Sequence, residues 1–163
     1  FNLFFDNAWN SLVEMDSYGH DVEAGWLLCE AARVLEDRQL MDRANRLALD
    51  VTDACLAEGL SDKGYMMYEK KGGRTTGHAS WWGQIETMIA CVNAWQISGN
   101  DVYLQSADTV WTFVKDCMID REYGEWYSDC FDGEPKKDTP KVSMWRCPYH
   151  TVRLGVEIHN RLK

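Results

Sequence analysis

The chain has 163 residues, of which 45% are apolar and 26% charged, and its formal net charge is −9. This length is enough for one domain with a hydrophobic core. The negative charge argues against binding to nucleic acid or to anionic membranes, because both attract clustered lysine and arginine. No apolar run approaches the roughly 20 residues that span a bilayer.

The chain contains eight tryptophans and six cysteines. Tryptophan lines sugar and aromatic-ligand sites, although it also fills helical cores. No two cysteines form a CxxC pair, which argues against a zinc ribbon. Most cysteines fall within helical apolar patterns, where a free thiol behaves as a small apolar side chain. We therefore expect a cytoplasmic protein that does not need disulfides.

Two helices are predicted in the first third of the chain, over residues 21–36 and 39–58, because apolar side chains recur every three or four positions. Gly59 suits the end of the second helix. The predicted inward positions are Val22, Trp26, Leu27, Ala31, Val34 and Leu35 in the first helix, and Leu40, Ala44, Leu47, Val51, Ala54 and Cys55 in the second.

Residues 60–78 are rich in turn-forming residues and predict a β-hairpin or a long loop, with 65–68 as a short strand. Helical spacing returns over 80–98 and 101–118. Residues 119–145 again read as a hairpin plus a loop. A final helix is expected to start near Pro148, a residue suited to a first turn, and to end at Arg161 or Lys163.

The order of these elements is helix pair, long loop, helix pair, long loop and final helix. We expect an all-α fold of the (α/α)6 barrel family, in which antiparallel helix pairs place alternate loops at one end. Two and a half pairs form only an open arc with an unburied edge. Residues 1–163 are therefore expected to be part of a larger closed barrel, or else to pair with a second copy.

One candidate site lies in the segment SYGHDVEAGWLL at residues 17–28. His20 stands at the start of a predicted helix, with Asp21 and Glu23 in the first turn. Residues 20 and 23 share a helical face, and a carboxylate beside an imidazole fixes the orientation of the ring. Acidic residues are also favourable at any helix start, so a purely structural role stays open.

A second candidate site lies in KVSMWRCPYHTVR at residues 141–153. His150 follows Trp145 and Pro148 and precedes Arg153, so aromatic rings and a cation surround it. A histidine packed beneath a loop explains the same pattern. Two histidines at helix starts nevertheless indicate paired acid/base chemistry.

Trp82 and Glu86 share one face of the third predicted helix. An indole flat against a sugar ring, with a carboxylate on a hydroxyl, is typical of carbohydrate sites. The same stripe also suits a helical core. A metal bound by His20, Glu23 and His150 is a competing but weaker interpretation, because no third ligand is fixed locally.

Taken together, these segments resemble the N-acylglucosamine 2-epimerase superfamily, and within it the branch that acts on cellobiose and mannobiose. The matching segments are Leu3–Asp6, SYGHDVEAGWLL at 17–28, WWGQIE at 81–86, GEWYSD at 124–129 and KVSMWRCPYHTVR at 141–153. They occur in family order, and they correspond to the C-terminal part of the family's (α/α)6 barrel.

The resemblance implies a sugar 2-epimerase that interconverts glucose and mannose at the reducing end of a β-1,4 disaccharide, through ring opening and a cis-enediolate. It implies His20 and His150 as the acid/base pair, and Glu23 as the carboxylate that orients the first histidine. It implies no cofactor and no metal. The residues implied in substrate binding are Asp21, Trp82, Glu86, Trp145 and Arg153.

Two other functions stay open at this point. The chain would also suit a non-catalytic carbohydrate-binding fragment, or an α/α-barrel glycoside hydrolase that uses Glu23 and Glu86 as its carboxylate pair. The resemblance further implies that the missing N-terminal helices supply other residues to the same cleft. We therefore expect residues 1–163 alone to have negligible turnover.

Overall fold

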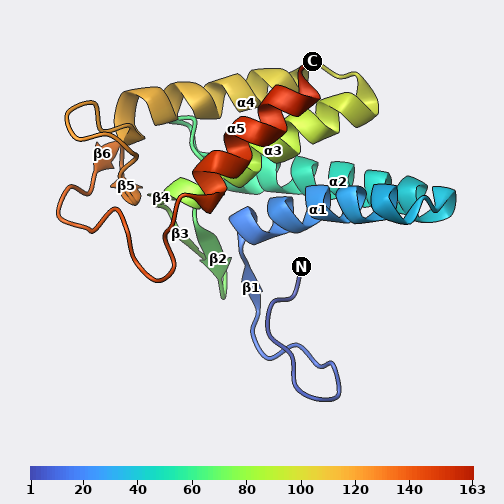
Figure 1. Ribbon diagram of the computed structural model, residues 1–163. Helices are drawn as coiled ribbons and strands as arrows, with labels where there is room; N and C mark the ends of the chain where they lie inside the picture. Colours follow the sequence, from blue (N-terminus) through green and yellow to red (C-terminus); the bar gives the residue numbers. More distant parts are fainter.

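The computed structural model describes residues 1–163, and most of the chain is helical (Figure 1). A single π-helical turn, Val114–Met118, continues the fourth helix. All five predicted helices are confirmed, and their ends agree with the predicted ends to within a few residues. The helices are α1 Tyr18–Leu35, α2 Arg38–Gly59, α3 Trp81–Ser98, α4 Val102–Phe113 and α5 Tyr149–Arg161.

Helix α3 is the centre of the arc (Figure 1). All residues from Gly83 to Ala94 are buried, because α1, α2, α4 and α5 each pack against a different side of this helix. Most of these buried residues are apolar, as expected for a helix with neighbours on every side. The antiparallel pairs α1–α2 and α3–α4 follow one another as the sequence predicts, and α5 adds half of a third pair.

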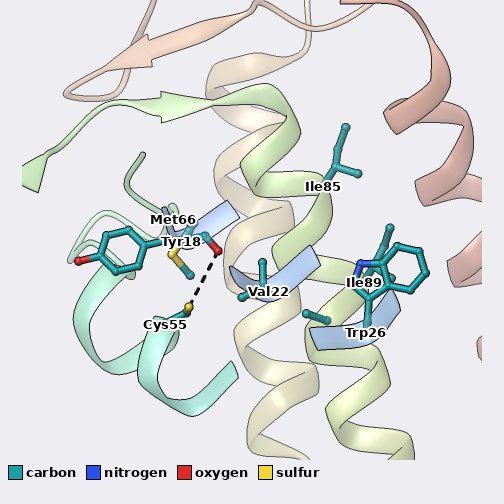
Figure 2. Packing of buried hydrophobic residues seen from close by; sticks show 8 residues of the cluster. Tyr18, Val22, Trp26, Cys55, Met66, Ile85 and Ile89 are labelled. Atoms are coloured by element: carbon teal, nitrogen blue, oxygen red, sulfur yellow. Dashed lines mark hydrogen bonds between the residues drawn. The ribbon is translucent and has the colours of Figure 1, made fainter. Parts of the chain in front are cut away.

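The main core lies between α1, α2 and α3 (Figure 2). Val22 and Trp26 lie one turn apart on α1 and pack toward Ile85 and Ile89 of α3. At the start of α1 the thiol of Cys55 donates a weak hydrogen bond to the Tyr18 carbonyl, at 3.9 Å. A second core, below α4, joins Val110 and Phe113 to the loops.

The predicted inward faces of α1 and α2 are right at only four of the twelve positions. Val22, Trp26, Ala44 and Cys55 are buried as expected. The remaining positions are half-buried or exposed: Leu27, Ala31, Val34, Leu35, Leu40, Leu47, Val51 and Ala54. Several of them line a hollow of about 520 Å³ between α1 and α2. Apolar spacing identifies a face of a helix, but it does not tell which parts of that face meet a neighbour in this chain.

Both predicted hairpins are present, each as part of a small antiparallel sheet. The first hairpin begins later in the sequence than expected. In the first sheet, β2 Glu69–Lys71 pairs with β3 Arg74–Thr76 and with β1 Met15–Asp16, whereas the expected strand at 65–68 is mostly loop. The turn is formed by Gly72 and Gly73, with φ of 52° and 75°. Tyr65 and Met66 are buried instead, so their apolar character serves the core.

The second sheet joins segments that are far apart in the sequence. β5 Asp129–Phe131 pairs with β6 Glu134–Pro135 and with β4 Ala79–Ser80, which leads directly into α3. The strands gather at the end of the arc where α1, α3 and α5 begin (Figure 1). The structure has no helix long and apolar enough to cross a membrane.

Gly59 allows the end of α2 to approach the loop that follows. A Cβ at this position would lie 2.7 Å from Met66 Sδ and from Tyr18 Cγ, closer than packed atoms allow. We expect Gly59→Ala to lower the free energy of unfolding by about 1–3 kcal/mol, measured by urea denaturation. In Gly25→Ala the new Cβ meets Ala48 at an ordinary 3.5 Å. This control should be neutral or stabilising by up to about 1 kcal/mol, and equal losses in both variants would contradict the explanation.

Candidate active site

His150 is held in the first turn of α5 by a carboxylate from α3. Its Nδ1 lies 2.7 Å from Glu86 Oε1; Glu86 is fully buried, whereas His150 keeps 4% of its surface exposed. Trp26 Nε1 donates to the other oxygen of Glu86 at 2.9 Å. Because an ionised carboxylate only accepts hydrogen bonds, the proton of the neutral ring is placed on Nδ1. Nε2 of His150 therefore carries no proton, so this nitrogen can accept one.

Arg153 lies one turn further along α5 and joins two carboxylates. Its Nη2 donates to Glu23 Oε1 at 2.7 Å and to Glu86 Oε1 at 2.9 Å, and it lies 3.0 Å from His150 Nδ1. Burial lowers the pKa of Arg153, but the charges of Glu86 and Glu23 outweigh it, so the pKa is raised. The guanidinium thus stays charged and links α1, α3 and α5.

His20 is exposed in the first turn of α1 and has different neighbours. Its Nδ1 lies 2.8 Å from the Ser17 hydroxyl. Its ring packs on Trp82 with the centroids 4.5 Å apart, and the His150 ring lies 5.9 Å from the same indole. Gly19 makes this close packing possible, because a Cβ there would meet the Trp82 ring at 2.6 Å. The two histidines therefore flank one tryptophan.

The structure brings together six of the eight predicted site residues and leaves two apart. The six are His20, Glu23, Trp82, Glu86, His150 and Arg153. Trp145 is 79% exposed and contacts neither histidine ring. Asp21 is a buried residue in the first turn of α1. Neither of these two side chains faces the histidine pair.

The expected contact between Glu86 and a sugar hydroxyl stays a prediction, and the carboxylate has other partners in this structure. The carboxylate is fully buried, and His150, Trp26 and Arg153 occupy its oxygens. This geometry disfavours the glycoside hydrolase interpretation, because Glu86 cannot reach a glycosidic oxygen. Glu23 and Glu86 instead share a single guanidinium nitrogen.

The weaker metal interpretation is not supported, because its proposed ligands His20, Glu23 and His150 do not form one cluster. The group with ligand-like spacing is Glu23, Glu86 and His150, whose atoms lie within 4.8 Å of one another. Arg153 Nη2 lies within 3.0 Å of all three atoms. A fixed cation already fills the space that a metal would take, so these residues fit a guanidinium better than an ion.

Three residues near the histidines were missed as site residues by the sequence reasoning. Ser17 stands three positions before His20, and side chains at this spacing lie on the same face of a helix. Trp26 follows Glu23 by one turn and was assigned only to the core. Tyr149 lies against His150 with ring centroids 3.9 Å apart. Only the spacing of Ser17 and Trp26 gave a usable signal in the sequence.

A third histidine lies between the two sheets, near the same end of the helices. His78 stacks between Tyr68 and Phe131, at centroid distances of 4.7 and 4.9 Å, and its Nε2 is 3.5 Å from Asp129 Oδ1. Burial lowers the pKa of His78, and the opposing charges of Asp129 and Glu69 do not offset this effect.

The depressed pKa of His78 gives a signed pH dependence of stability. At pH 8 the ring is neutral in both states. As the pH falls through about 6.5, the unfolded chain binds a proton that the folded chain does not, so the free energy of unfolding falls. His78→Phe should lose less stability between pH 7 and pH 5 than the unsubstituted protein, in urea titrations. The difference at pH 8 isolates the packing effect, and parallel pH curves would contradict the prediction.

Comparisons with known proteins identify the class and the family. The helix pairs form an incomplete arc of the (α/α)6 barrel fold, with one histidine in the first turn of α1 and another in the first turn of α5. The family model of N-acylglucosamine 2-epimerase (GlcNAc 2-epimerase) matches residues 2–153. The chain belongs to this family.

Individual relatives agree with this assignment. The cellobiose 2-epimerase of Bacteroides fragilis is 41% identical and matches 96% of this chain and 40% of its own length. A crystal structure of a sugar epimerase from a ruminal bacterium has a TM-score of 0.94 at 36% identity, covering 98% of this chain and 41% of that chain. The cellobiose 2-epimerase of Bacillus thermoamylovorans B4167 has a TM-score of 0.86 at 34% identity, with 97% and 40% covered. The chain thus spans about two fifths of the length of these relatives.

Proposed function

We propose that the protein containing this chain is a sugar 2-epimerase that interconverts reducing-end glucose and mannose in β-1,4 disaccharides of the cellobiose and mannobiose type. One observation supports this proposal above the others. His20 and His150 flank the Trp82 indole, and each ring is held by its own partner. Similarity to named cellobiose 2-epimerases supports the substrate class.

The chemistry begins with the open-chain aldehyde, whose carbonyl acidifies the C2 proton. One histidine takes this proton on its bare nitrogen, and the C–H electron pair moves toward the C1 oxygen to give a cis-enediolate. After rotation about C2–C3, the other histidine returns a proton to the opposite face of C2. Imidazole suits both steps because it exchanges protons near neutral pH. The carbonyl is the electron sink, so the reaction needs no cofactor and no metal.

The other residues of the cluster have supporting roles in this proposal. Trp82 forms an aromatic wall for the sugar, while Glu23 and Arg153 tie α1 to α5 near the histidines. Trp145, and less directly Asp21, remain proposed substrate-binding residues, although neither faces the pair in this chain. The exposed position of Trp145 leaves its indole free to contact a second sugar.

We further propose that residues 1–163 are the C-terminal part of a single α/α-barrel catalytic domain. The exposed apolar side chains of α1 and α2 support this, because burying them would require a further packing partner. That partner is the remainder of the barrel or a second copy of the chain. Residues 1–163 alone are then expected to have negligible turnover. The six free cysteines support a reducing, cytoplasmic location.

The test is to incubate the full-length protein with cellobiose in D₂O. Formation of glucosyl-mannose with deuterium at C2 is the expected result. Free glucose would instead indicate a glycosidase, and binding without conversion would indicate a carbohydrate-binding protein. Either outcome overturns the proposed activity. The same assay on residues 1–163 tests the expected loss of turnover in the isolated chain.

A further inference from the structure

Ser17 is a helix N-cap residue whose side chain does not cap its helix. Its backbone is extended, with φ −107° and ψ 96°, as N-cap residues usually are. Serine is favoured there because its hydroxyl accepts a hydrogen bond from the first-turn amides. The Ser17 hydroxyl makes no such bond and lies 2.8 Å from His20 Nδ1. In contrast, the Asp37 carboxylate caps α2 through the amides of Gln39 and Leu40.

The two histidines are therefore held by chemically different partners. Glu86 only accepts hydrogen bonds, so the His150 proton is fixed on Nδ1. The Ser17 hydroxyl both donates and accepts, and it carries no charge. Ser17 is only 3% exposed, whereas His20 is exposed. Because Nδ1 is tied to the buried side, Nε2 of His20 is left on the open side of the ring.

We propose that Ser17 is a positioning residue for His20, and that it makes the two histidines unequal proton carriers. This inference rests on the proposed epimerase function. With the hydroxyl as acceptor, the neutral ring holds its proton on Nδ1 and takes the C2 proton on Nε2. The imidazolium that results keeps the same Nδ1–H bond to Ser17, so the ring does not turn between the two steps. His150 has the same arrangement, but with a buried carboxylate in place of the hydroxyl.

Loss of the Ser17 hydroxyl should therefore impair only the proton transfers that His20 carries out. Ser17→Ala leaves His20 Nδ1 without its partner, while His150 keeps Glu86. One epimer loses its C2 proton to His150, and that nitrogen can exchange the proton with solvent. Return of a deuteron to the same face gives labelled starting sugar without epimerisation. From that epimer, exchange should continue while inversion slows, because inversion needs His20.

The experiment uses the full-length protein in D₂O, starting separately from each of the two epimers. Ser17→Ala should lower kcat for epimerisation by about 10–100-fold, with KM within about twofold. From one epimer only, the ratio of C2 exchange to epimerisation should rise by about tenfold. Ser17→Thr keeps the hydroxyl and should restore the rate. An unchanged kcat in Ser17→Ala, or equal losses of exchange and inversion from both epimers, would overturn the inference.

Asp37→Ala is the matched control for a structural role. It removes a real cap, so it should lower Tm by about 2 °C or more without changing kcat. Ser17→Ala should change kcat without lowering Tm to that extent. The opposite pattern would assign Ser17 to helix stability and overturn the proposal.

A spectroscopic measurement separates failure of this inference from failure of the proposed function. In ¹⁵N NMR spectra, His20 should carry its neutral-state proton on Nδ1, and Ser17→Ala should change this tautomer population. His150 should be unaffected. If the unsubstituted protein shows no C2 exchange, the epimerase proposal fails, and the His20 tautomer then decides the role of Ser17. An identical tautomer in both proteins would overturn the inference.

Discussion

Replacing His150 with alanine should lower kcat of the full-length protein for cellobiose by about 10²–10⁴-fold, the usual contribution of a positioned acid/base group. The variant loses the only imidazole that Glu86 orients. His20 remains, so one proton transfer is still possible, but no group stands ready on the other side to complete inversion. KM should change much less, because His150 is nearly buried and contributes little binding surface.

Two further variants make this prediction specific. His20→Ala should cause a loss of similar size, since each epimer needs both histidines. His159→Ala is the control, because His159 is exposed near the end of the same helix, away from the cluster. Product analysis by chromatography and C2 deuterium uptake measure the effects. Full activity in either His20→Ala or His150→Ala would contradict the assignment of the acid/base pair.

The helices could be predicted from the sequence because their signal is local. Apolar spacing along α3, with Gly99 after it, gives the right bounds without knowledge of any partner. The strands depend on distant residues. Met15 pairs with Lys71, and Ala79 pairs with Cys130, so each small sheet includes a strand whose partner lies far away in the sequence. No local pattern identifies a strand of two or three residues.

The candidate site, too, could be predicted only in part from the sequence. The sequence places His20 and His150 at helix starts, and the structure agrees. The direction of each neighbouring side chain was not predictable. Glu86 shares a helical face with Trp82, yet it turns into the protein, because Trp26 and Arg153 from two other helices supply its hydrogen bonds. Asp21 is a neighbour of His20 in sequence, but helix geometry directs it to the buried side.

The same buried carboxylate gives the second large prediction. Glu86 is fully buried and accepts hydrogen bonds from three residues, namely Trp26, His150 and Arg153. Glu86→Ala removes this shared acceptor. The N–H groups of Trp26 and His150 then lose their partner, and the Arg153 charge keeps only Glu23. Breaking a buried ion pair on one side costs about 3–5 kcal/mol. We expect a loss of this size in the free energy of unfolding by urea titration, together with loss of activity.

Glu86→Gln separates orientation from stability. The amide keeps the shape of the carboxylate, but its NH₂ group must face either Trp26 or the His150–Arg153 pair, all of which donate. If the NH₂ faces His150, the ring proton moves to Nε2, and the base is lost. We expect kcat to fall by about 10²-fold or more with a smaller loss of stability. The control is Glu157→Gln, which alters one bond to Arg161 on the same helix as His150 and should leave kcat unchanged. A Glu86→Gln variant with full kcat would show that the His150 tautomer does not depend on this carboxylate.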